Sequence, residues 1–475
     1  MLRKILKTNL FRQFAGFGLG PIAGMFISFL TVPVTTRLLL PEEFGKTSLF
    51  TIVTSIFSII AFLGLDQSYV RFYNVKDYSK QKILFNSFMI PFLITILLGI
   101  VSISFMHPIS MWMYGSYEPV IMLLFFPFLI FTLIERFAFL SIRMQLKGTL
   151  YSTITIFAQF LSFILLLILL LSYEKSFRSI ILSSYISMFI RSFIVLWLTR
   201  HDWKFSKVLY DKNLQTDMLK FALPLIPATI ISWLLHSFDK IAIRQWSTYE
   251  ELGLYAAAYK FVSLVAVFQV IFTTSWVPIA YKWFEEKKDK RYFDLITNVV
   301  TVIMSLIYVF IVISRDIVYL FLGEAYRNSS SVFIFLLFMP VIYTISEAAT
   351  IGISLMKKTV YSLYATIVSA VINLILNYLL VPTMGATGAA IGTCASYIAF
   401  FWLRVIFACK VWYKISLSSN YINSIFMIIL LFCVYYKLPK YCELLIGLGT
   451  LIINIPFMIS IIKRLNIPGN EVIKK

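Results

Sequence analysis

The stretch from Phe221 to Lys260 reads FALPLIPATIISWLLHSFDKIAIRQWSTYEELGLYAAAYK. Its first part, Phe221 to His236, is sixteen residues long and carries no charge. Three ionisable residues follow soon afterwards, namely Asp239, Lys240 and Arg244. An apolar helix of about 20 residues crosses the roughly 30 Å of hydrocarbon in a bilayer. The stretch therefore predicts a membrane-spanning helix near 221–238 with charged groups at its outer third.

Similar apolar runs recur along the whole chain. It has 475 residues, of which 60% are hydrophobic and 13% are charged. This composition, with a mean hydropathy of +0.86, excludes a water-soluble globular protein of ordinary kind. Because hydrocarbon offers no water to free backbone groups, long apolar spans of this length must be helices. We therefore predict an all-α polytopic membrane protein.

The apolar runs predict about fourteen transmembrane helices. They lie near residues 15–36, 47–65, 84–106, 120–140, 151–172, 179–199, 221–238, 254–281, 295–314, 331–355, 360–381, 388–408, 421–436 and 443–462. The termini and every second loop hold 30 Lys and Arg residues against 10 in the other loops, when Arg136 and Arg404 are counted with the loops that they adjoin. This bias predicts a multi-pass protein with both termini in the cytoplasm. It also explains the net charge of +20 without a nucleic-acid partner.

An internal repeat divides the chain into two halves. The letters FA at 14–15 and EFG at 43–45 recur as FA at 221–222 and ELG at 251–253, an offset of 207 to 208 residues. Six predicted spans fit inside this offset, and an even number restores the same orientation in the membrane. We therefore expect two parallel six-helix bundles with pseudo-twofold symmetry, followed by two further helices. The predicted domains are 1–212, 213–415 and 416–475, the last holding the two additional helices and a cytoplasmic tail.

Prolines and glycines recur in the predicted spans. Pro21 and Pro33 in the first span, and Pro224 and Pro227 in the seventh, remove helix hydrogen bonds and are predicted hinges. Ridges of small residues are predicted to let neighbouring helices approach closely, and they consist of Gly16, Gly20 and Gly24, and of Gly388 and Gly392.

Several ionisable residues fall inside predicted spans. Arg191 lies about midway along the span near 179–199, where an arginine costs about 2.5 to 3.5 kcal/mol on translocon scales. We interpret Arg191 as a functional residue, with a structural ion pair to Glu347 or Glu135 as the alternative. Arg404 lies close to the cytoplasmic end of its span, and so does the adjacent pair Glu135 and Arg136. Interfacial anchoring is the expected role of these residues.

The cations of the spans suggest a site for an anionic group. Lys240 and Arg244 are four residues apart and share one helix stripe, and Arg37 is their counterpart in the first half. Such a stripe would suit a phosphate, whereas simple flanking of the span is the alternative. The predicted substrate-binding residues of a cation-lined cleft between the bundles are Arg191, Arg37, Lys240, Arg244 and Lys260. The predicted coupling or charge-pairing residues are Asp239, Glu347 and Glu135.

Patterns for catalysis and metal binding are absent from the sequence. The four cysteines form no CxxC pair and the three histidines have no ligand spacing, so no metal site is expected. There is no GxxxxGK[ST] loop to bind ATP, and no HExxH, GxSxG or Asp-x-Asp cluster. We therefore expect a transporter, not an enzyme, with no catalytic residues and no cofactor.

Three segments resemble the bacterial polysaccharide (O-antigen type) flippases, which belong to the multidrug/oligosaccharidyl-lipid/polysaccharide exporter superfamily. They are LLLPEEFGKTSLF at 38–50, DKIAIRQWSTYEELGLYAAAYK at 239–260 and VPTMGATGAAIGTCASY at 381–397. The likeness spans nearly the whole chain and implies a MATE-like fold. An aspartate in the seventh span recurs in the family, and it carries over here to Asp239. Basic residues of the family's cavity carry over by position and type only.

The resemblance also implies an activity. Such a protein moves undecaprenyl-diphosphate-linked oligosaccharides, such as O-antigen or other surface polysaccharide units, to the outer leaflet of the bacterial inner membrane by alternating access. Expected partners are this lipid-linked glycan, membrane lipids, and polysaccharide polymerase and chain-length machinery; protons, sodium or the membrane potential would drive the cycle. The alternatives are a multidrug or cation exporter of the same superfamily, a flippase for the lipid-linked peptidoglycan precursor, and a membrane-embedded glycan polymerase or acyltransferase.

Overall fold

The computed structural model describes residues 9–203, 209–413 and 418–465, and in these ranges every regular element is a helix. The predicted all-α class is thereby confirmed. The chain divides into two compact units, unit 1 at Met1–Ile241 and unit 2 at Ala242–Lys475. This division falls inside a helix, whereas the predicted domain limits follow residues 212 and 415. Those limits stay a prediction.

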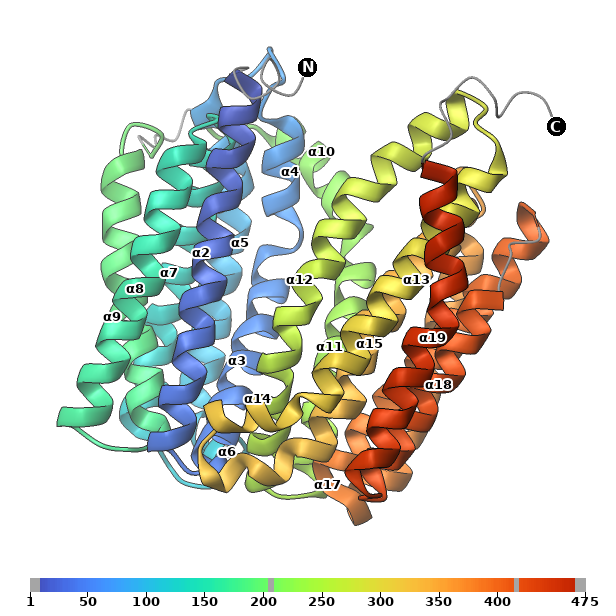
Figure 1. Cartoon of the computed structure of the whole chain (residues 1–475). Coiled ribbons are helices and arrows are strands. Elements are labelled where there is room, and N and C mark those ends of the chain that lie inside the picture. The colour runs from blue at the N-terminus through green and yellow to red at the C-terminus, as the bar shows by residue number, and fades with distance from the viewer. Residues whose placement is uncertain (1–8, 204–208, 414–417, 466–475) are drawn as a thin grey trace. The chain divides into compact units, whose positions relative to one another are not determined.

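Unit 1 contains the helices from α2 to α10 and the larger part of α11 (Figure 1). Their bounds are α2 Asn9–Leu38, α3 Pro41–Phe62, α4 Leu65–Phe72, α5 Lys80–Ser104, α6 Met106–Tyr114, α7 Pro119–Met144, α8 Gly148–Ser172, α9 Phe177–Thr199, α10 Lys212–Ala222 and α11 Leu225–Trp246. The short helices α4 and α10 lie together at one end of this unit, and α6 lies at the opposite end (Figure 1).

Close helix contacts hold unit 1 together. Along α2 and α8, a Cβ on Gly20 would lie 2.8 Å from the Cα of Ser152, and the Gly20 N–H donates to Ser152 Oγ at 2.8 Å. Only a residue without a side chain fits there, which confirms the packing role predicted for this glycine. Elsewhere in the unit, α3, α7 and α9 enclose an aromatic core that includes Phe50, Phe128 and Tyr185.

Unit 2 is built around one central helix. Its elements are α12 Tyr249–Glu285, α13 Lys290–Ile313, α14 Arg315–Phe321, the 3-10 helix η2 Glu324–Ser329, α15 Ser330–Ala349, α16 Ile351–Leu355, α17 Val360–Val411, α18 Ser418–Tyr435 and α19 Lys440–Leu465. The central helix is α15, which packs against α12, α13 and α17 and is buried along most of its length. Because its neighbours already surround it, α15 offers little surface to lipid.

The longest helix of unit 2, α17, is a hairpin of two antiparallel segments. At Gly385 the backbone leaves the helical conformation, with φ 53° and ψ −131°. Behind this kink the two arms touch, because a Cβ on Gly388 would lie 2.6 Å from the carbonyl oxygen of Leu380. Asn373 and Thr393 form a hydrogen bond of 3.3 Å between the arms. The element therefore covers both spans predicted at 360–381 and 388–408, and the second glycine ridge packs these arms together.

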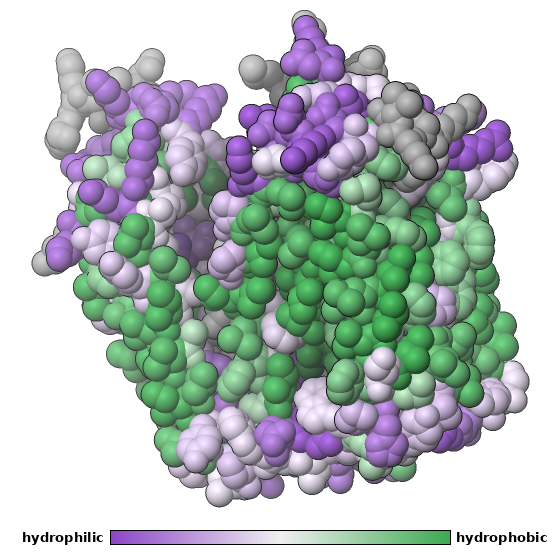
Figure 2. Space-filling view, turned by 180° about the vertical axis from the view of Figure 1, so that it is seen from behind, coloured by the Kyte–Doolittle hydropathy of each residue, from purple (hydrophilic) through white to green (hydrophobic). Residues whose placement is uncertain are grey.

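Many helices are long and apolar enough to cross a membrane. Ten in the described ranges meet this test, or up to eleven if the bent pair α10 and α11 counts as one span. Two shorter apolar helices, Ala23–Leu38 and Ser419–Tyr435, lie where further spans were predicted. Figure 2 shows apolar side chains gathered in a broad band on the visible face, with hydrophilic residues at both ends of the band. The protein is a multi-pass membrane protein, and the count of fourteen helices stays a prediction.

A buried polar ladder attaches the last two helices to α13. Asn423 of α18 and Asn454 of α19 exchange two hydrogen bonds, of 3.0 and 2.8 Å. Ser305 Oγ of α13 donates to the side-chain oxygen Oδ1 of Asn423 at 2.9 Å. All three side chains are at most 1% exposed. Hydrogen bonds of this kind join helices in membranes, where apolar packing alone specifies the neighbours weakly.

Replacing Asn423 by Leu should destabilise the protein by about 1 to 2 kcal/mol, because the substitution leaves Asn454 and Ser305 without their buried partner. Thermal unfolding of the purified full chain in detergent measures the effect. Ile425→Leu is the matched control, since Ile425 lies on the same helix and is 54% exposed. Equal melting temperatures for the two variants would show that the ladder contributes nothing.

Candidate functional site

Arg191, the predicted mid-span cation, lies in α9 and faces Glu135 of α7. Its Nε lies 3.3 Å from Glu135 Oε1, and its Nη2 lies 3.4 Å from Glu135 Oε2. The two side chains are 17% and 13% exposed. The packing of α7 against α9, through rings such as Phe128 and Tyr185, brings the two groups to the same depth. Arg191 thus forms one of the two ion pairs expected as the alternative to a purely functional role.

Unit 2 contains a second buried ion pair, between Glu347 of α15 and Arg404 of α17. Arg404 Nη1 donates to Glu347 Oε1 at 2.8 Å and to Ser346 Oγ at 3.0 Å. Its guanidinium lies over the ring of Phe400, at 5.0 Å from the ring centroid. Arg404 is only 7% exposed, so the interfacial anchoring predicted for it is wrong. The central helix α15 supplies a carboxylate at the depth of Arg404, and the side chain has no need to reach the headgroups.

The two ion pairs occupy equivalent places in the internal repeat. Glu135 and Glu347 are 212 residues apart, and Arg191 and Arg404 are 213 residues apart. These separations are close to the offset of 207 to 208 residues read from the repeated motifs. In each half the glutamate belongs to the fourth predicted span and the arginine to the sixth. In each unit, a Glu–Arg pair therefore joins the helices of the fourth and sixth predicted spans.

Two further glutamates occupy equivalent positions at helix N-termini. Glu43 Oε2 accepts a hydrogen bond of 2.8 Å from the backbone N–H of Phe177, the first residue of α9. Glu251 Oε2 accepts one of 2.8 Å from the N–H of Ala386, directly after the kink in α17. Carboxylates are stabilising there because the first N–H groups of a helix have no partner within it. These are the glutamates of the repeated EFG and ELG motifs, and the bond of Glu251 joins two of the segments that carry the family resemblance.

Sequence reasoning singled out both repeated motifs without finding the role of their glutamates. The signal was the recurrence of the motif in both halves of the chain, as EFG at 43–45 and ELG at 251–253. It could not identify the partners, because the N–H groups of Phe177 and Ala386 lie 134 and 135 residues further along the chain. A close backbone approach is also visible at Gly385, where a Cβ would lie 2.5 Å from Glu251 Oε2.

The Glu43 bond belongs to a charged cluster at one end of unit 1. Lys46 lies 2.9 Å from Glu42 and 3.1 Å from Glu43. Nearby, Arg178 in the first turn of α9 pairs with Glu118 at 2.7 Å. The hydrogen bond from Arg178 holds the pKa of Glu118 below its ordinary value of 4.5. The cluster therefore fixes the start of α9 against α3 and α7 by charge as well as by packing.

The remaining predicted charged residues of the site lie in both units. Asp239 is buried and Lys240 is half-buried, both in the part of α11 that belongs to unit 1. Arg244 follows in unit 2 and lies over the ring of Tyr249, at 4.3 Å from its centroid. Two exposed cations complete the set, Arg37 in the last turn of α2 and Lys260 in α12. The cation-lined cleft predicted between the bundles, and the roles of these residues in it, stay predictions.

The predicted hinge prolines have different surroundings. Pro21 and Pro33 lie within α2, which is continuous in the structure. Pro224 lies in the break between α10 and α11, where the two helices bend by 42°, and Pro227 lies in the first turn of α11. The structure therefore places a break between two helices at Pro224, whereas Pro21, Pro33 and Pro227 lie within helices. Whether any of them moves during a transport cycle stays a prediction.

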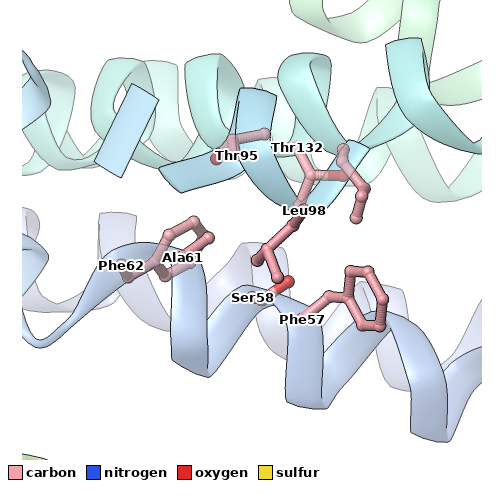
Figure 3. A pocket seen from close by; sticks show the side chains of 8 residues that line it. Phe57, Ser58, Ala61, Phe62, Thr95, Leu98 and Thr132 are labelled. Atoms are coloured by element: carbon pink, nitrogen blue, oxygen red, sulfur yellow. The ribbon is translucent and has the colours of Figure 1, made fainter. Parts of the chain in front are cut away.

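A small pocket in unit 1 lies between α3, α5 and α7 (Figure 3). Three hydroxyl groups line it, those of Ser58, Thr95 and Thr132, and each donates to a carbonyl of its own helix. The other lining residues are apolar, namely Phe57, Ala61, Phe62, Leu98 and Leu129. Because its lining contains no ionisable side chain, this pocket is distinct from the predicted anion site.

Replacing Glu251 by Ala should destabilise the protein by about 1 to 2 kcal/mol, since it removes the acceptor for the first N–H after the kink. Glu250→Ala is the matched control, because Glu250 is exposed in the same helical turn and its loss should cost less than about 0.5 kcal/mol. Thermal unfolding of both variants decides the matter. A control variant as unstable as Glu251→Ala would contradict the capping role.

The lowered pKa of Glu118 predicts a pH dependence. A carboxylate whose pKa is depressed by folding adds stability above its ordinary value of 4.5, and this stability is lost as the pH falls through the depressed value. Arg178→Gln should remove this contribution. The difference in melting temperature between the wild type and Arg178→Gln should therefore be largest near neutral pH and shrink in acid. A difference that stays constant down to strongly acidic pH would exclude this linkage.

Comparison with known proteins reveals relatives of both sequence and fold. The chain is 24% identical over 170 residues to the probable low-salt glycan biosynthesis flippase Agl15 of Haloferax volcanii, a match that covers 35% of each protein. In fold it is similar to the lipid II flippase MurJ in an inward closed conformation, with a TM-score of 0.68, 17% identity, and coverage of 96% of this chain and 99% of MurJ. It is also similar to a multidrug resistance MATE family transporter of the MOP superfamily in an inward-facing conformation. That match has a TM-score of 0.62 and 15% identity, and it covers 81% of this chain and 94% of the transporter. The MATE-like fold is thereby confirmed. A family model described as polysaccharide biosynthesis protein matches residues 12–284, more than half of the chain, and the protein therefore belongs to this family.

Proposed function

We propose that this protein is a flippase that carries an undecaprenyl-diphosphate-linked oligosaccharide from the cytoplasmic to the outer leaflet of the bacterial inner membrane. The glycan would be an O-antigen or other surface polysaccharide repeat unit, as in lipopolysaccharide synthesis. Membership of the polysaccharide biosynthesis family carries the proposal. The name of the Haloferax relative, a glycan biosynthesis flippase, and that of MurJ, a lipid II flippase, support it.

The chemistry of the substrate fits a guanidinium at mid-membrane depth. A diphosphate presents several anionic oxygens, and the planar fork of an arginine binds such oxygens two at a time. Arg191 offers this group inside a span of unit 1, and 17% of its side chain is exposed. In the proposed cycle the diphosphate and glycan bind at cations such as Arg191, while the polyprenyl tail remains in lipid. Alternating access would then expose the headgroup on the other side.

Net transport needs a source of bias between the two states. A proton, a sodium ion or the membrane potential could supply it, the last at about 2.3 kcal/mol per elementary charge and 100 mV. Glu135 and Glu347 each pair with an arginine, and Asp239 is buried in α11. Glu347, Glu135 and Asp239 are therefore the carboxylates to test first for coupling.

The proposal includes an orientation and partners. The excess of Lys and Arg in alternate loops supports an arrangement with both termini in the cytoplasm. Lipid-linked glycan delivered to the outer leaflet is a substrate for polymerisation, so a polysaccharide polymerase and its chain-length machinery are the proposed protein partners. Multidrug export is the rival activity within the same fold, and the family match argues against it.

Removal of the gene from its host tests the activity. Cells without this protein should accumulate lipid-linked oligosaccharide with its glycan facing the cytoplasm, lose the surface polysaccharide and continue to grow. Arrest of growth with accumulation of the peptidoglycan precursor would instead support the precursor flippase. A change in drug sensitivity alone, with surface glycan intact, would support the exporter.

Within this function, Arg191→Gln should lower surface glycan at least about tenfold, the equivalent of ~1.4 kcal/mol of lost interaction with the anionic headgroup. Arg200→Gln is the matched control, because Arg200 follows the same helix and is exposed. Glycan on the cell surface is quantified at equal membrane abundance of each variant. Full export by Arg191→Gln would exclude Arg191 from the binding site.

A further inference from the structure

The two repeat-related arginines differ in how firmly their carboxylates hold them. Arg404 Nη1 donates to Glu347 at 2.8 Å and to Ser346 at 3.0 Å, and the guanidinium stacks on Phe400. These distances are typical of strong, charge-assisted hydrogen bonds. With three neighbours engaged and 7% exposure, the Arg404 head group has little freedom to leave Glu347.

Arg191 is held much more loosely. Its two approaches to Glu135 are 3.3 Å from Nε and 3.4 Å from Nη2, and only the longer one is a hydrogen bond. The Nε groups of Arg191 and Arg404 both lack a hydrogen-bond partner, so the two arginines differ in the contacts of their Nη groups. The remaining contact of Nη2 is with the sulfur of Met188 at 3.5 Å, and a thioether is a weak acceptor. A bidentate arginine–carboxylate pair normally has N–O distances of about 2.7 to 2.9 Å. The guanidinium of Arg191 therefore has unused hydrogen-bonding capacity beside a carboxylate in loose contact.

The surroundings of Arg191 explain why some anion must stay close to it. One helical turn from Glu135, the ring of Phe131 packs against Phe189 and Phe193, with ring centroids 5.1 and 5.2 Å apart. Such apolar neighbours keep the local dielectric low, so an arginine without a counter-ion would be costly. Glu135 meets this need when no other anion is present.

We propose that Glu135 is an exchangeable internal ligand of Arg191, which yields the guanidinium to the phosphate oxygens of an anionic headgroup, whereas Glu347 holds Arg404 permanently. The identity of the headgroup as a diphosphate rests on the proposed function. The exchange involves no covalent step. One anion replaces another beside the same cation, so the pairing of the buried charge is preserved throughout.

Physical chemistry favours such an exchange at Arg191 over a simple addition. A phosphate group carries more charge and more acceptor oxygens than a carboxylate, and it matches the fork of the guanidinium equally well. The binding free energy of the phosphate is reduced by the cost of breaking the contact between Glu135 and Arg191. The net affinity is therefore moderate, and release on the opposite side of the membrane remains feasible.

Thermal unfolding of the purified full chain with inorganic pyrophosphate tests this idea. In Glu135→Gln the guanidinium has lost its charged competitor, so the half-saturating pyrophosphate concentration should fall about tenfold relative to the wild type, equivalent to ~1.4 kcal/mol. Glu347→Gln is the matched control from the same repeat, and its half-saturating concentration should equal that of the wild type. Arg191→Gln should abolish the response.

Several outcomes would overturn the exchange. Pyrophosphate that fails to stabilise Glu135→Gln, or that acts equally on Glu135→Gln and Glu347→Gln, would show that Glu135 is only a structural partner. If Glu135→Gln does not fold, Glu135→Asp serves instead, because its shorter carboxylate should compete less and give a smaller shift in the same direction. An unchanged half-saturating concentration in Glu135→Asp would equally contradict the proposal.

The source of the anion and the proposed function are tested separately. A short-chain polyprenyl diphosphate, titrated beside pyrophosphate, should act at a lower concentration if a lipid headgroup is the ligand. A response to pyrophosphate but not to the polyprenyl diphosphate would exclude the lipid headgroup. Loss of the Glu135 effect in a protein whose deletion still abolishes surface glycan would overturn only the exchange. Intact surface glycan in the deletion strain would overturn the proposed function itself.

Discussion

Hydrocarbon does not solvate charge, and this constraint organises the interior of both units. Each strongly buried carboxylate–guanidinium contact, such as Glu347 with Arg404 or Glu443 with Arg315, joins two different helices of one unit. Loss of either partner would leave a buried charge alone, which costs several kcal/mol. Unlike apolar packing, which permits many helix neighbours in a membrane, these pairs require particular ones. The charges therefore specify helix arrangement as well as any substrate chemistry.

The repeat shows which of these contacts belong to the basic plan of a bundle. In unit 1, α9 is held by Glu43 at its first residue and by Glu135 at Arg191. The second arm of α17 in unit 2 is held in the same two ways, by Glu251 after the kink and by Glu347 further along. Both helices are the sixth span of their half. Because each is fixed at two separated points by other helices of its own unit, it should move together with that unit in any conformational change.

The sequence alone was sufficient for the features that depend on local composition. Apolar runs predicted helical spans, and glycine spacing predicted close packing at Gly20 and between the arms of α17, because each signal lies within one helix or its immediate loops. Local sequence patterns did not predict the contacts between helices that are far apart in the chain. Arg404 was expected at the interface from its place near a span end, but its burial depends on how α15 lies against α17, which no local pattern encodes. The partners of Glu43 and Glu251 could not be predicted for the same reason, because they lie on helices far along the chain.

The divergence of the two Glu–Arg pairs is understandable for a carrier that must also release its cargo. Two equally available guanidiniums would each add binding free energy for an anionic headgroup, and every additional ~1.4 kcal/mol slows dissociation about tenfold if association is unchanged. Tight binding that is equal in both states shifts no equilibrium between them. A duplicated bundle that keeps one arginine in permanent structural contact and leaves the other in looser contact avoids this excess of affinity. The shorter bonds of Arg404 and the longer contacts of Arg191 are the distribution that such a requirement would select.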